Sequence, residues 1–424
     1  MTIAAVILCA DAPAAHLSVG GMPLSIRHIK ELHTRGVRVF YLYGVTALPT
    51  ARQRSRLPDD VVLHVVPPDG DSLPLAGALL PLAGDSLPLA GDSLPQHLQR
   101  LLPTAADVLL VRGDCLIDPR LLAELLTCTL PRWLSVPQAP MPTLPAAARL
   151  SPAHLDTWAA AGLAQWLQHS PQLRPEALDD YSPTHRGPVP FYVQRITTAT
   201  EAKMATQTLI RAAQKCALDL PALLLDPMFE NRLVFWLCDT RITPNQVTLF
   251  TALLGALIAA LFLYGWLRLG IVLAYAVEVL DGVDGKLART KLQTSRLGEL
   301  EHVLDFFTEH AWYLTITIFL VTSTQAPQLW WVGGGLMVSD FIDNMLYCLG
   351  QRFCGKQLDE LGTFDRRFRL IAGRRNIYAW MFFFGFWAGL PVQTFVVTLV
   401  WSLVTIGVHG VRLVYHARQR LALA

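Results

Sequence analysis

Hydrophobic and polar residues follow two different patterns along the chain. In residues 1 to about 195, short apolar runs with strand-like alternation are separated by segments with helical spacing. This pattern predicts an α/β domain with a mostly parallel sheet flanked by helices. The predicted strands are Thr2–Cys9, Val37–Gly44, Val61–Val66, Val108–Arg112 and Phe191–Gln194, and the clearest helices are Ser25–His33 and Pro119–Thr127.

A low-complexity segment, Gly70–Pro95, interrupts this domain. It repeats units such as GDSLPLA at a seven-residue period. Because Pro and Gly recur too often for a helix, we expect an inserted loop without chemical function.

From about Val247 the chain becomes rich in long apolar runs. A bilayer core needs about 20 apolar residues per helix, and the second and fifth runs reach this length only with their polar flanks. We therefore predict six transmembrane helices in an all-α domain of residues 243–424. Their apolar cores are Val247–Leu267, Gly270–Leu280, Ala311–Thr324, Leu329–Leu349, Tyr378–Leu390 and Phe395–Leu413.

Composition and charge agree with a membrane protein. Only 16% of residues are charged and 52% are hydrophobic, whereas soluble domains carry about 25% charged residues. The seven cysteines show no paired spacing, which argues against a disulfide framework or a zinc site. The net charge of +2 says little by itself. We expect membrane lipids, and no nucleic acid, as partners.

Basic residues gather in alternate loops. They lie between the second and third runs, between the fourth and fifth, and after the sixth, whereas TSTQAPQ and LPVQ carry no charge. By the positive-inside rule, both termini and the α/β domain face the cytosol, as in a multi-pass protein of the cell inner (cytoplasmic) membrane. Residues 196–242 would form a linker and an amphipathic helix on the membrane surface.

Two acidic pairs flank the basic loop between the second and third runs. Asp281 and Asp284 are three residues apart, and Glu301 and Asp305 are four apart, so each pair shares one helical face. Four carboxylates that converge need a cation to remain ionised. Their hard oxygen ligands favour Mg²⁺ or Mn²⁺ over zinc.

Neighbouring residues suit a phosphate ligand. Gly285 and Ala288 are small enough for close approach of a ligand, and Arg289 is a natural partner for phosphate. In the alternative interpretation, the acids cap helices or pair with nearby basic residues. For Glu278, one turn before Asp281, a hydrogen bond between helices and a role in the site both stay open. A role in the site or an internal salt bridge stays open for Asp340 and Asp343.

These residues resemble the CDP-alcohol phosphotransferase family (also CDP-alcohol phosphatidyltransferase) over residues about 215–424. Asp281-x2-Asp284-Gly285-x2-Ala288-Arg289-x8-Gly298 matches the family motif D-x2-D-G-x2-A-R-x8-G-x3-D-x3-D through its second glycine. The preceding ITPNQVTL also resembles the family's entry into its first helix.

The second half of the motif departs from the family pattern. Strict counting from Gly298 places the last two acids at His302 and Phe306, but Glu301 and Asp305 stand one residue earlier. A one-residue slip turns a helix by about 100°. The four-residue spacing of Glu301 and Asp305 nevertheless survives, so both still share a face. Glu301 is our preferred third metal ligand, with His302 as the alternative.

The resemblance implies a role for each matching residue. Asp281, Asp284, Glu301 and Asp305 would surround Mg²⁺ or Mn²⁺, and Asp305 would also accept the proton of the acceptor hydroxyl. Asp281, Gly285, Ala288 and Arg289 would contact the nucleotide of a CDP-alcohol. Homodimers are usual in this family. Lys356, Arg374 and Arg375 are candidates for binding an acceptor phosphate or lipid head groups, although positive loops are expected on this side in any case.

The N-terminal domain resembles sugar-nucleotide and inositol-phosphate nucleotidyltransferases, which have a Rossmann-like fold of the GT-A type. VLLVRGDCLID resembles the family's metal-binding strand end, with Asp114 as the candidate ligand. The nucleotide loop is replaced by CADAPAAHLSVGG, without the usual basic residues. We therefore expect weak or no cytidylyltransferase activity. The fusion resembles bifunctional enzymes that make CDP-inositol and then transfer phospho-inositol.

The sequence thus predicts a membrane enzyme that transfers a phospho-alcohol from CDP-inositol or CDP-diacylglycerol to a hydroxyl acceptor and releases CMP. One alternative is a catalytically impaired membrane scaffold, which the slipped motif favours. The other is an ion-coupled transporter, because carboxylates within the membrane also mark ion pathways.

Overall fold

The computed structural model describes residues 3–9, 17–44, 54–66, 107–137, 144–216, 218–293 and 297–423, together with Thr50, Leu94, Leu98 and Gln99. The chain forms two compact units. One is an α/β unit of residues 1–180 and 189–212, and the other is a helical unit of residues 181–188 and 213–424. Apart from Leu94, the predicted insert Gly70–Pro95 lies outside the described residues.

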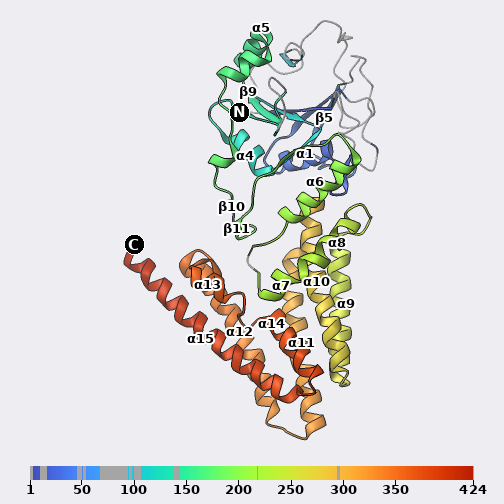
Figure 1. The fold of residues 1–424 in the computed structure, drawn as a ribbon, viewed down its shortest axis with the longest axis vertical. Coiled ribbons are helices and arrows are strands. Elements are labelled where there is room, and N and C mark those ends of the chain that lie inside the picture. Colours follow the sequence, from blue (N-terminus) through green and yellow to red (C-terminus); the bar gives the residue numbers. More distant parts are fainter. Residues whose placement is uncertain are drawn as a thin grey trace. The chain divides into compact units, whose positions relative to one another are not determined.

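A six-stranded sheet with the order β5-β4-β1-β6-β9-β8 forms the centre of the α/β unit (Figure 1). The strands β1 (Ala4–Leu8), β4 (Val39–Tyr43), β5 (Val62–Val66) and β6 (Val108–Arg112) are parallel. They coincide with four of the predicted strands. At the far edge, β9 (Ala147–Leu150) runs antiparallel to β6, and β8 (Trp133–Leu134) runs antiparallel to β9.

Alternating side chains of the sheet enter two cores. In β1, Ala5 and Ile7 pack in a cluster with residues of α1 (Leu24–His33) and α4 (Pro119–Thr127). Ala4 and Val6 point to the opposite face and join Trp158 of α5 (Pro152–His169). Burial on both faces explains why these strands are almost continuously apolar.

Smaller elements complete this unit. The strand β7 (Cys115–Ile117) pairs with β12 (Val193–Arg195), and β2 (Ser18–Val19) pairs with β3 (Met22–Pro23). A 3-10 turn spans Pro175–Ala177. The helix α6 (Ala199–Ala212) packs through Ala202, Ala205 and Leu209 on a separate apolar cluster.

Among its described residues, the helical unit contains five helices of 20 residues or more and several short ones. Its long helices are α9 (Pro244–Leu263), α10 (Leu267–Lys291), α11 (Leu297–Thr324), α12 (Leu329–Cys354) and α15 (Pro391–Leu423). The shorter elements are the hairpin of β10 (Tyr181–Ser182) and β11 (Gly187–Pro188), α7 (Leu220–Leu224), α8 (Asp226–Cys238), a 3-10 turn at Leu358–Glu360, α13 (Thr363–Phe368) and α14 (Arg375–Trp387).

The helices α9–α12, α14 and α15 occupy the six predicted apolar runs. Within the described residues, however, only Pro244–Leu263 and Pro391–Arg420 have the length and apolar composition needed to cross a membrane. For two of the other four helices the physical reason is clear. The basic residues predicted to follow the second helix lie inside α10, and α14 has only 13 residues. An α/β domain followed by a helical part is therefore confirmed, while six spans are not.

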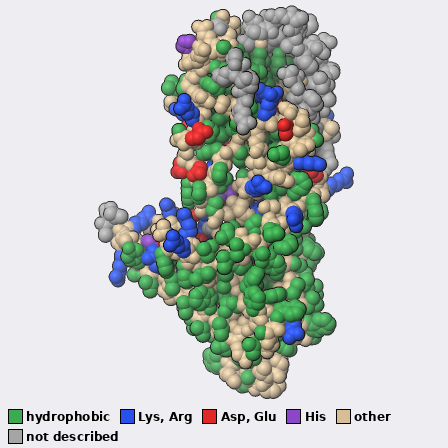
Figure 2. Space-filling model, in the orientation of Figure 1, with side chains coloured by type: hydrophobic (Ala, Val, Ile, Leu, Met, Phe, Trp, Pro, Cys, Tyr) green, Lys and Arg blue, Asp and Glu red, His purple; other side chains and the backbone are tan. Residues whose placement is uncertain are grey.

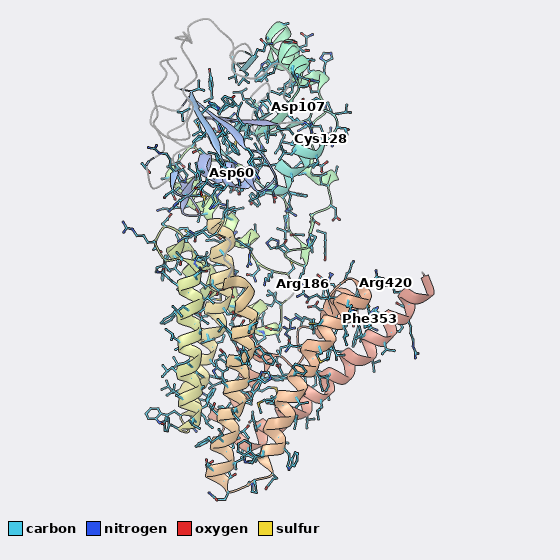
Figure 3. The ribbon with its side chains drawn as sticks, turned by 180° about the vertical axis from the view of Figure 1, so that it is seen from behind. Asp60, Asp107, Cys128, Arg186, Phe353 and Arg420 are labelled. Carbon is cyan, nitrogen blue, oxygen red and sulfur yellow. The ribbon has the colours of Figure 1, made fainter. Side chains whose placement is uncertain are left out.

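Figure 2 shows mainly hydrophobic side chains over the visible face of the helical unit, with Lys and Arg gathered near the C-terminal end of the chain. At that end Arg420 donates a 3.0 Å hydrogen bond to the Phe353 carbonyl and so joins α15 to α12 (Figure 3). Arg186 of the hairpin forms an ion pair with Asp359, which precedes α13.

Candidate active site

The start of α9 is fixed by a reciprocal cap. Gln246 N–H donates to Thr243 Oγ1 at 3.4 Å, Thr243 N–H donates to Gln246 Oε1 at 3.0 Å, and Pro244 occupies the first turn. A capping box of this kind satisfies two amides that the first turn would otherwise leave unpaired. It sets the position from which Thr248 and Thr251 face the acids of α10.

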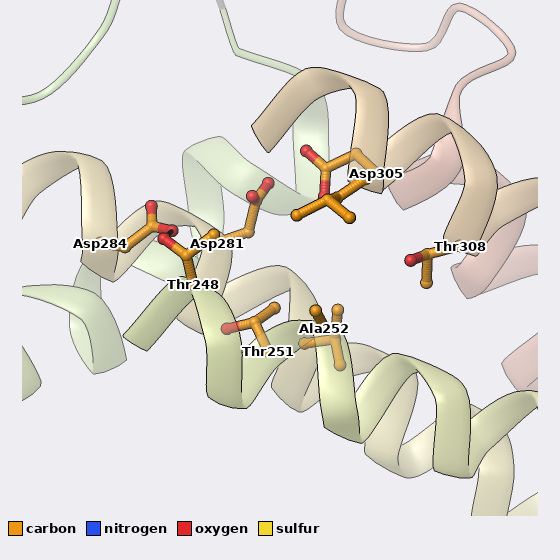
Figure 4. Close-up of a pocket in the computed structure, with 9 residues that line it drawn as sticks. Thr248, Thr251, Ala252, Asp281, Asp284, Asp305 and Thr308 are labelled. Carbon is orange, nitrogen blue, oxygen red and sulfur yellow. Dashed lines mark hydrogen bonds between the residues drawn. The ribbon is translucent and has the colours of Figure 1, made fainter. Parts of the chain in front are cut away.

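Three carboxylates from two helices line one small pocket (Figure 4). Asp281 and Asp284 come from α10, and Asp305 comes from α11. The helix α9 contributes its two threonines, so three helices meet here. The described residues that line the pocket are Thr248, Thr251, Ala252, Val277, Asp281, Asp284, Leu304, Asp305 and Thr308. The residues that the sequence singled out as two separate pairs thus share one cavity.

Asp284 is the most deeply buried acid of the pocket, at 2% exposure. Its Oδ2 accepts a 2.6 Å hydrogen bond from Thr248 Oγ1. Its Oδ1 is buried without a hydrogen-bond partner. A buried carboxylate oxygen without a partner is costly, so this atom is available for a ligand of the pocket.

Arg375, the first residue of α14, brings a guanidinium to the same acids. Its Nη2 lies 2.6 Å from Asp281 Oδ2, and its Nη1 lies 3.3 Å from Asp305 Oδ1 and 3.4 Å from Glu309 Oε1. One cation therefore compensates carboxylates of α10 and α11 together. We predicted a phosphate-binding role for Arg375, and the structure adds these acidic contacts to it.

Gly285 and Arg289 are adjacent on α10. A Cβ on Gly285 would lie 3.3 Å from Arg289 Nη1, so glycine leaves room for the guanidinium. Arg289 Nε donates a 2.9 Å hydrogen bond to the Ala213 carbonyl, which orients the side chain. Ala288 is half-buried on the same helix.

Other predicted residues lie apart from this pocket or have side chains outside the described residues. The side chains of Glu301 and His302 lie outside the described residues, so the choice between them stays a prediction. Lys356 is exposed after α12. Arg374 lies over the Tyr347 ring, with 5.2 Å from its Cζ to the ring centroid, and is not among the residues that line the pocket.

Sequence reasoning missed two features of the site. Glu309 continues the four-residue spacing of Glu301 and Asp305 by one more helical turn, and this spacing could have identified it. Thr248 and Thr251 are three residues apart in α9, but threonine pairs are too common in apolar helices to have been informative.

The resemblance implies a divalent metal, and the pocket can be tested for it. Within the described part of the chain, no three Asp, Glu, His or Cys side chains are arranged to hold an ion. The donors are nonetheless of the correct type, because three carboxylates face one pocket and Asp284 Oδ1 has no hydrogen-bond partner. Hard oxygen donors of this kind fit Mg²⁺ or Mn²⁺.

In the α/β unit, both oxygens of Asp114 are occupied by arginines. Arg112 donates to Oδ1 at 2.8 Å and to Oδ2 at 2.7 Å, and Arg195 donates to Oδ2 at 2.9 Å. Burial raises the pKa of Asp114, but hydrogen bonds from the two guanidinium groups outweigh it and hold that pKa below its usual value. These contacts give the carboxylate a structural role; its predicted role as a metal ligand stays a prediction.

Comparison with known proteins identifies the segment that carries the pocket. Residues 241–357 match the model of the CDP-alcohol phosphatidyltransferase family. A protein of Aquifex aeolicus named "Bifunctional IPC transferase and DIPP synthase" is 27% identical over 188 residues, which is 44% of this chain and 42% of the relative. A protein of the same name from Thermococcus kodakarensis is 36% identical over 27% of this chain and 26% of the relative. Another, from Rubrobacter xylanophilus, is 45% identical over 15% of this chain and 14% of the relative.

The match thus spans less than half the length of these curated relatives. The segment that matches the family runs from the cap of α9 to just beyond α12 and contains all three carboxylates of the pocket. The recognition made from the DxxDGxxAR motif is confirmed: residues 241–357 form a CDP-alcohol phosphatidyltransferase domain.

Proposed function

We propose that the protein transfers a phospho-alcohol from a CDP-alcohol to a hydroxyl acceptor and releases CMP. The observation that carries this proposal is the convergence of Asp281, Asp284 and Asp305 on one pocket within the family segment. A pyrophosphate donor is strongly anionic, and phosphoryl transfer depends above all on positioning and charge compensation. Divalent metal bound by these carboxylates would supply that compensation.

Two further roles in the reaction would be carried by Arg289 and Asp305. Arg289, whose guanidinium lies beside Gly285, would bind the nucleotide phosphates. Asp305 would accept the proton as the acceptor oxygen bonds to the phosphorus that carries the alcohol. The bond from that phosphorus to the bridging oxygen breaks at the same centre, and its electron pair leaves with CMP.

For the donor alcohol we favour inositol. The fused architecture resembles enzymes that make and use CDP-inositol, and the relatives named as bifunctional IPC transferases and DIPP synthases support this choice. CDP-diacylglycerol is the competing donor. The arginine pairs of Asp114 support an α/β unit that is structural or regulatory rather than a working cytidylyltransferase.

We further propose that the helical unit lies in the inner membrane as a homodimer, with both termini in the cytosol. In the part of the chain that the structure describes, two helices have the length and composition of membrane spans. On α9 a row of large apolar side chains is exposed: Leu249 at 62%, Leu253 at 63% and Leu257 at 51%. Such a stripe would be unfavourable in water and suits contact with lipid.

CMP release tests the proposed reaction directly. The purified protein would receive labelled CDP-inositol or CDP-diacylglycerol with an inositol phosphate or glycerol phosphate acceptor, across a series of Mg²⁺ and Mn²⁺ concentrations. We expect metal-dependent CMP release that Asp281→Asn and Asp305→Asn reduce by at least about 100-fold, in the range expected for a lost general base. Failure to release CMP from any CDP-alcohol would favour the scaffold or the transporter.

A separate pair of variants tests which residue of α11, Glu301 or His302, is the third metal ligand. If Glu301 is the third ligand, Glu301→Gln raises the metal concentration needed for half-maximal rate far more than His302→Ala does. The reverse order would assign the ligand to His302.

A further inference from the structure

We propose that Arg375 is a built-in cation of the site, which occupies Asp281 and Asp305 until a divalent ion binds and is then retained beside the pocket by Glu309. This inference rests on the proposed function, because it assumes that the same carboxylates bind metal. It assigns Arg375 a positioning role toward the metal site.

The geometry of Arg375 is that of a bridging cation rather than of a surface arginine. Its side chain is only 13% exposed, and its two terminal nitrogens contact acids of two helices. Asp281 and Asp305 are themselves partly accessible, at 24% and 26% of their side chains. The guanidinium therefore contacts two of the three acids that line the pocket, while the third, Asp284, accepts its hydrogen bond from Thr248.

Electrostatics explains why such a cation is needed. Three carboxylates around one small pocket repel one another in the absence of a counter-charge. A guanidinium can compensate several carboxylates at once because it presents five donors in a fixed plane. A divalent ion on the same oxygens would compete with it directly, since both need Asp281 and Asp305.

Two further acids give the displaced guanidinium a place to remain. Glu309 lies one turn beyond Asp305 on α11, and its Oε1 is 3.4 Å from Arg375 Nη1. Glu278 interacts electrostatically with Arg375 from α10, is 4% exposed, and has both carboxyl oxygens without a hydrogen-bond partner. Arg375 Nε is likewise buried without a partner. The side chain can thus leave Asp281 and Asp305 without becoming an uncompensated buried charge.

Direct metal binding tests this inference independently of turnover. Mn²⁺ would be titrated into the detergent-purified full chain, and the free ion would be measured by electron paramagnetic resonance. We expect Arg375→Gln to bind Mn²⁺ on the order of tenfold more tightly than the wild type, because the competing charge has been removed. Arg375→Lys, which keeps a charge but cannot span three acids, should fall between the two.

Arg374→Gln is the matched control, since it removes the same charge from the neighbouring residue, which lies over Tyr347. It should leave Mn²⁺ affinity within about twofold of the wild type. If Arg375→Gln unfolds without metal, Mn²⁺ should raise its melting temperature more than that of the wild type. If the wild type binds Mn²⁺ and Arg375→Gln binds it no more tightly, the inference about Arg375 is wrong and the proposed function is unaffected. Absence of Mn²⁺ binding in both proteins removes the metal site, and with it the proposed function.

Discussion

Thr248 Oγ1 donates a 2.6 Å hydrogen bond to Asp284 Oδ2, and this bond links α9 to the most buried acid of the pocket. Thr248→Val keeps the shape of the side chain but removes the donor, so both oxygens of Asp284 would lack a hydrogen-bond partner. An unpaired buried acceptor costs about 1–3 kcal/mol. We expect a lower melting temperature without metal and about a tenfold loss of kcat. Thr248→Ser restores the donor and should recover both; a Val variant with wild-type kcat would show that the bond has no role in catalysis.

Gly282 determines how closely α8 approaches α10. A Cβ at this position would overlap the Glu230 carboxyl group. Gly282→Ala must therefore push the Glu230 carboxyl group away from its ion pair with Lys286, and we expect a loss of about 1–3 kcal/mol, as for other overpacked sites. Gly334→Ala is the matched control, because a Cβ at this position of α12 meets no atom within 4 Å. Thermal unfolding in detergent should separate the two variants. Equal melting temperatures would mean that the contact between the two helices adjusts without cost.

Local spacing was enough to predict the first half of the site. Asp281 and Asp284 are three residues apart on one helix, so their shared face follows from helical geometry. Arg375 is different, because it lies 94 residues beyond Asp281 and reaches it only through the packing of α14 against α10. No local pattern contains that contact.

Helix boundaries likewise depend on contacts that no local sequence pattern contains. The sequence places Asp281 and Asp284 at the end of the second helix and the basic residues from Lys286 onward in the loop after it, but α10 continues to Lys291. Lys286 remains helical because Glu230 pairs with it inside the protein, and Leu292 ends the helix in a left-handed conformation, with a φ of 49°. In the sheet, the antiparallel strands β9 and β8 have only four and two residues and are too short to give a periodic signal.

In the α/β unit, two buried groups of α1 oppose each other in their response to pH. Burial lowers the pKa of His28 to about 4. The contribution of His28 to stability is therefore complete above about pH 6.5 and is lost as the pH falls toward 4. Burial raises the pKa of Glu31 to about 7, although the charge of Arg27 opposes it. The contribution of Glu31 is complete below about pH 4.5 and is lost as pH rises toward 7.

Between pH 6.5 and 4.5 the two effects should cancel, which leaves the stability of this unit nearly constant. Glu31→Gln removes one of them, and we expect the variant to lose about 2–3 kcal/mol over that range because His28 then acts alone. Hydrogen exchange of amides in β1 and β6, corrected for intrinsic rates, measures this stability within the full chain. His28→Gln should show the opposite slope. If the stability of the Glu31→Gln variant depended on pH as little as that of the wild type, the opposing contributions of His28 and Glu31 would be contradicted.

Lys286 and Glu230 form a buried ion pair between α10 and α8, with Nζ 2.5 Å from Oε2 and side-chain exposures of 2% and 7%. Asn231 Oδ1 accepts a second bond from the same ammonium at 2.9 Å. Because Lys286→Met leaves the carboxylate buried without its partner, we expect about 3–5 kcal/mol of destabilisation. The double variant Lys286→Met with Glu230→Met removes both charges and should recover most of that loss, since a well-packed apolar pair can match a buried ion pair. Thermal unfolding of the single and double variants measures the difference. If the double variant is as unstable as the single one, the loss comes from packing rather than from the isolated charge.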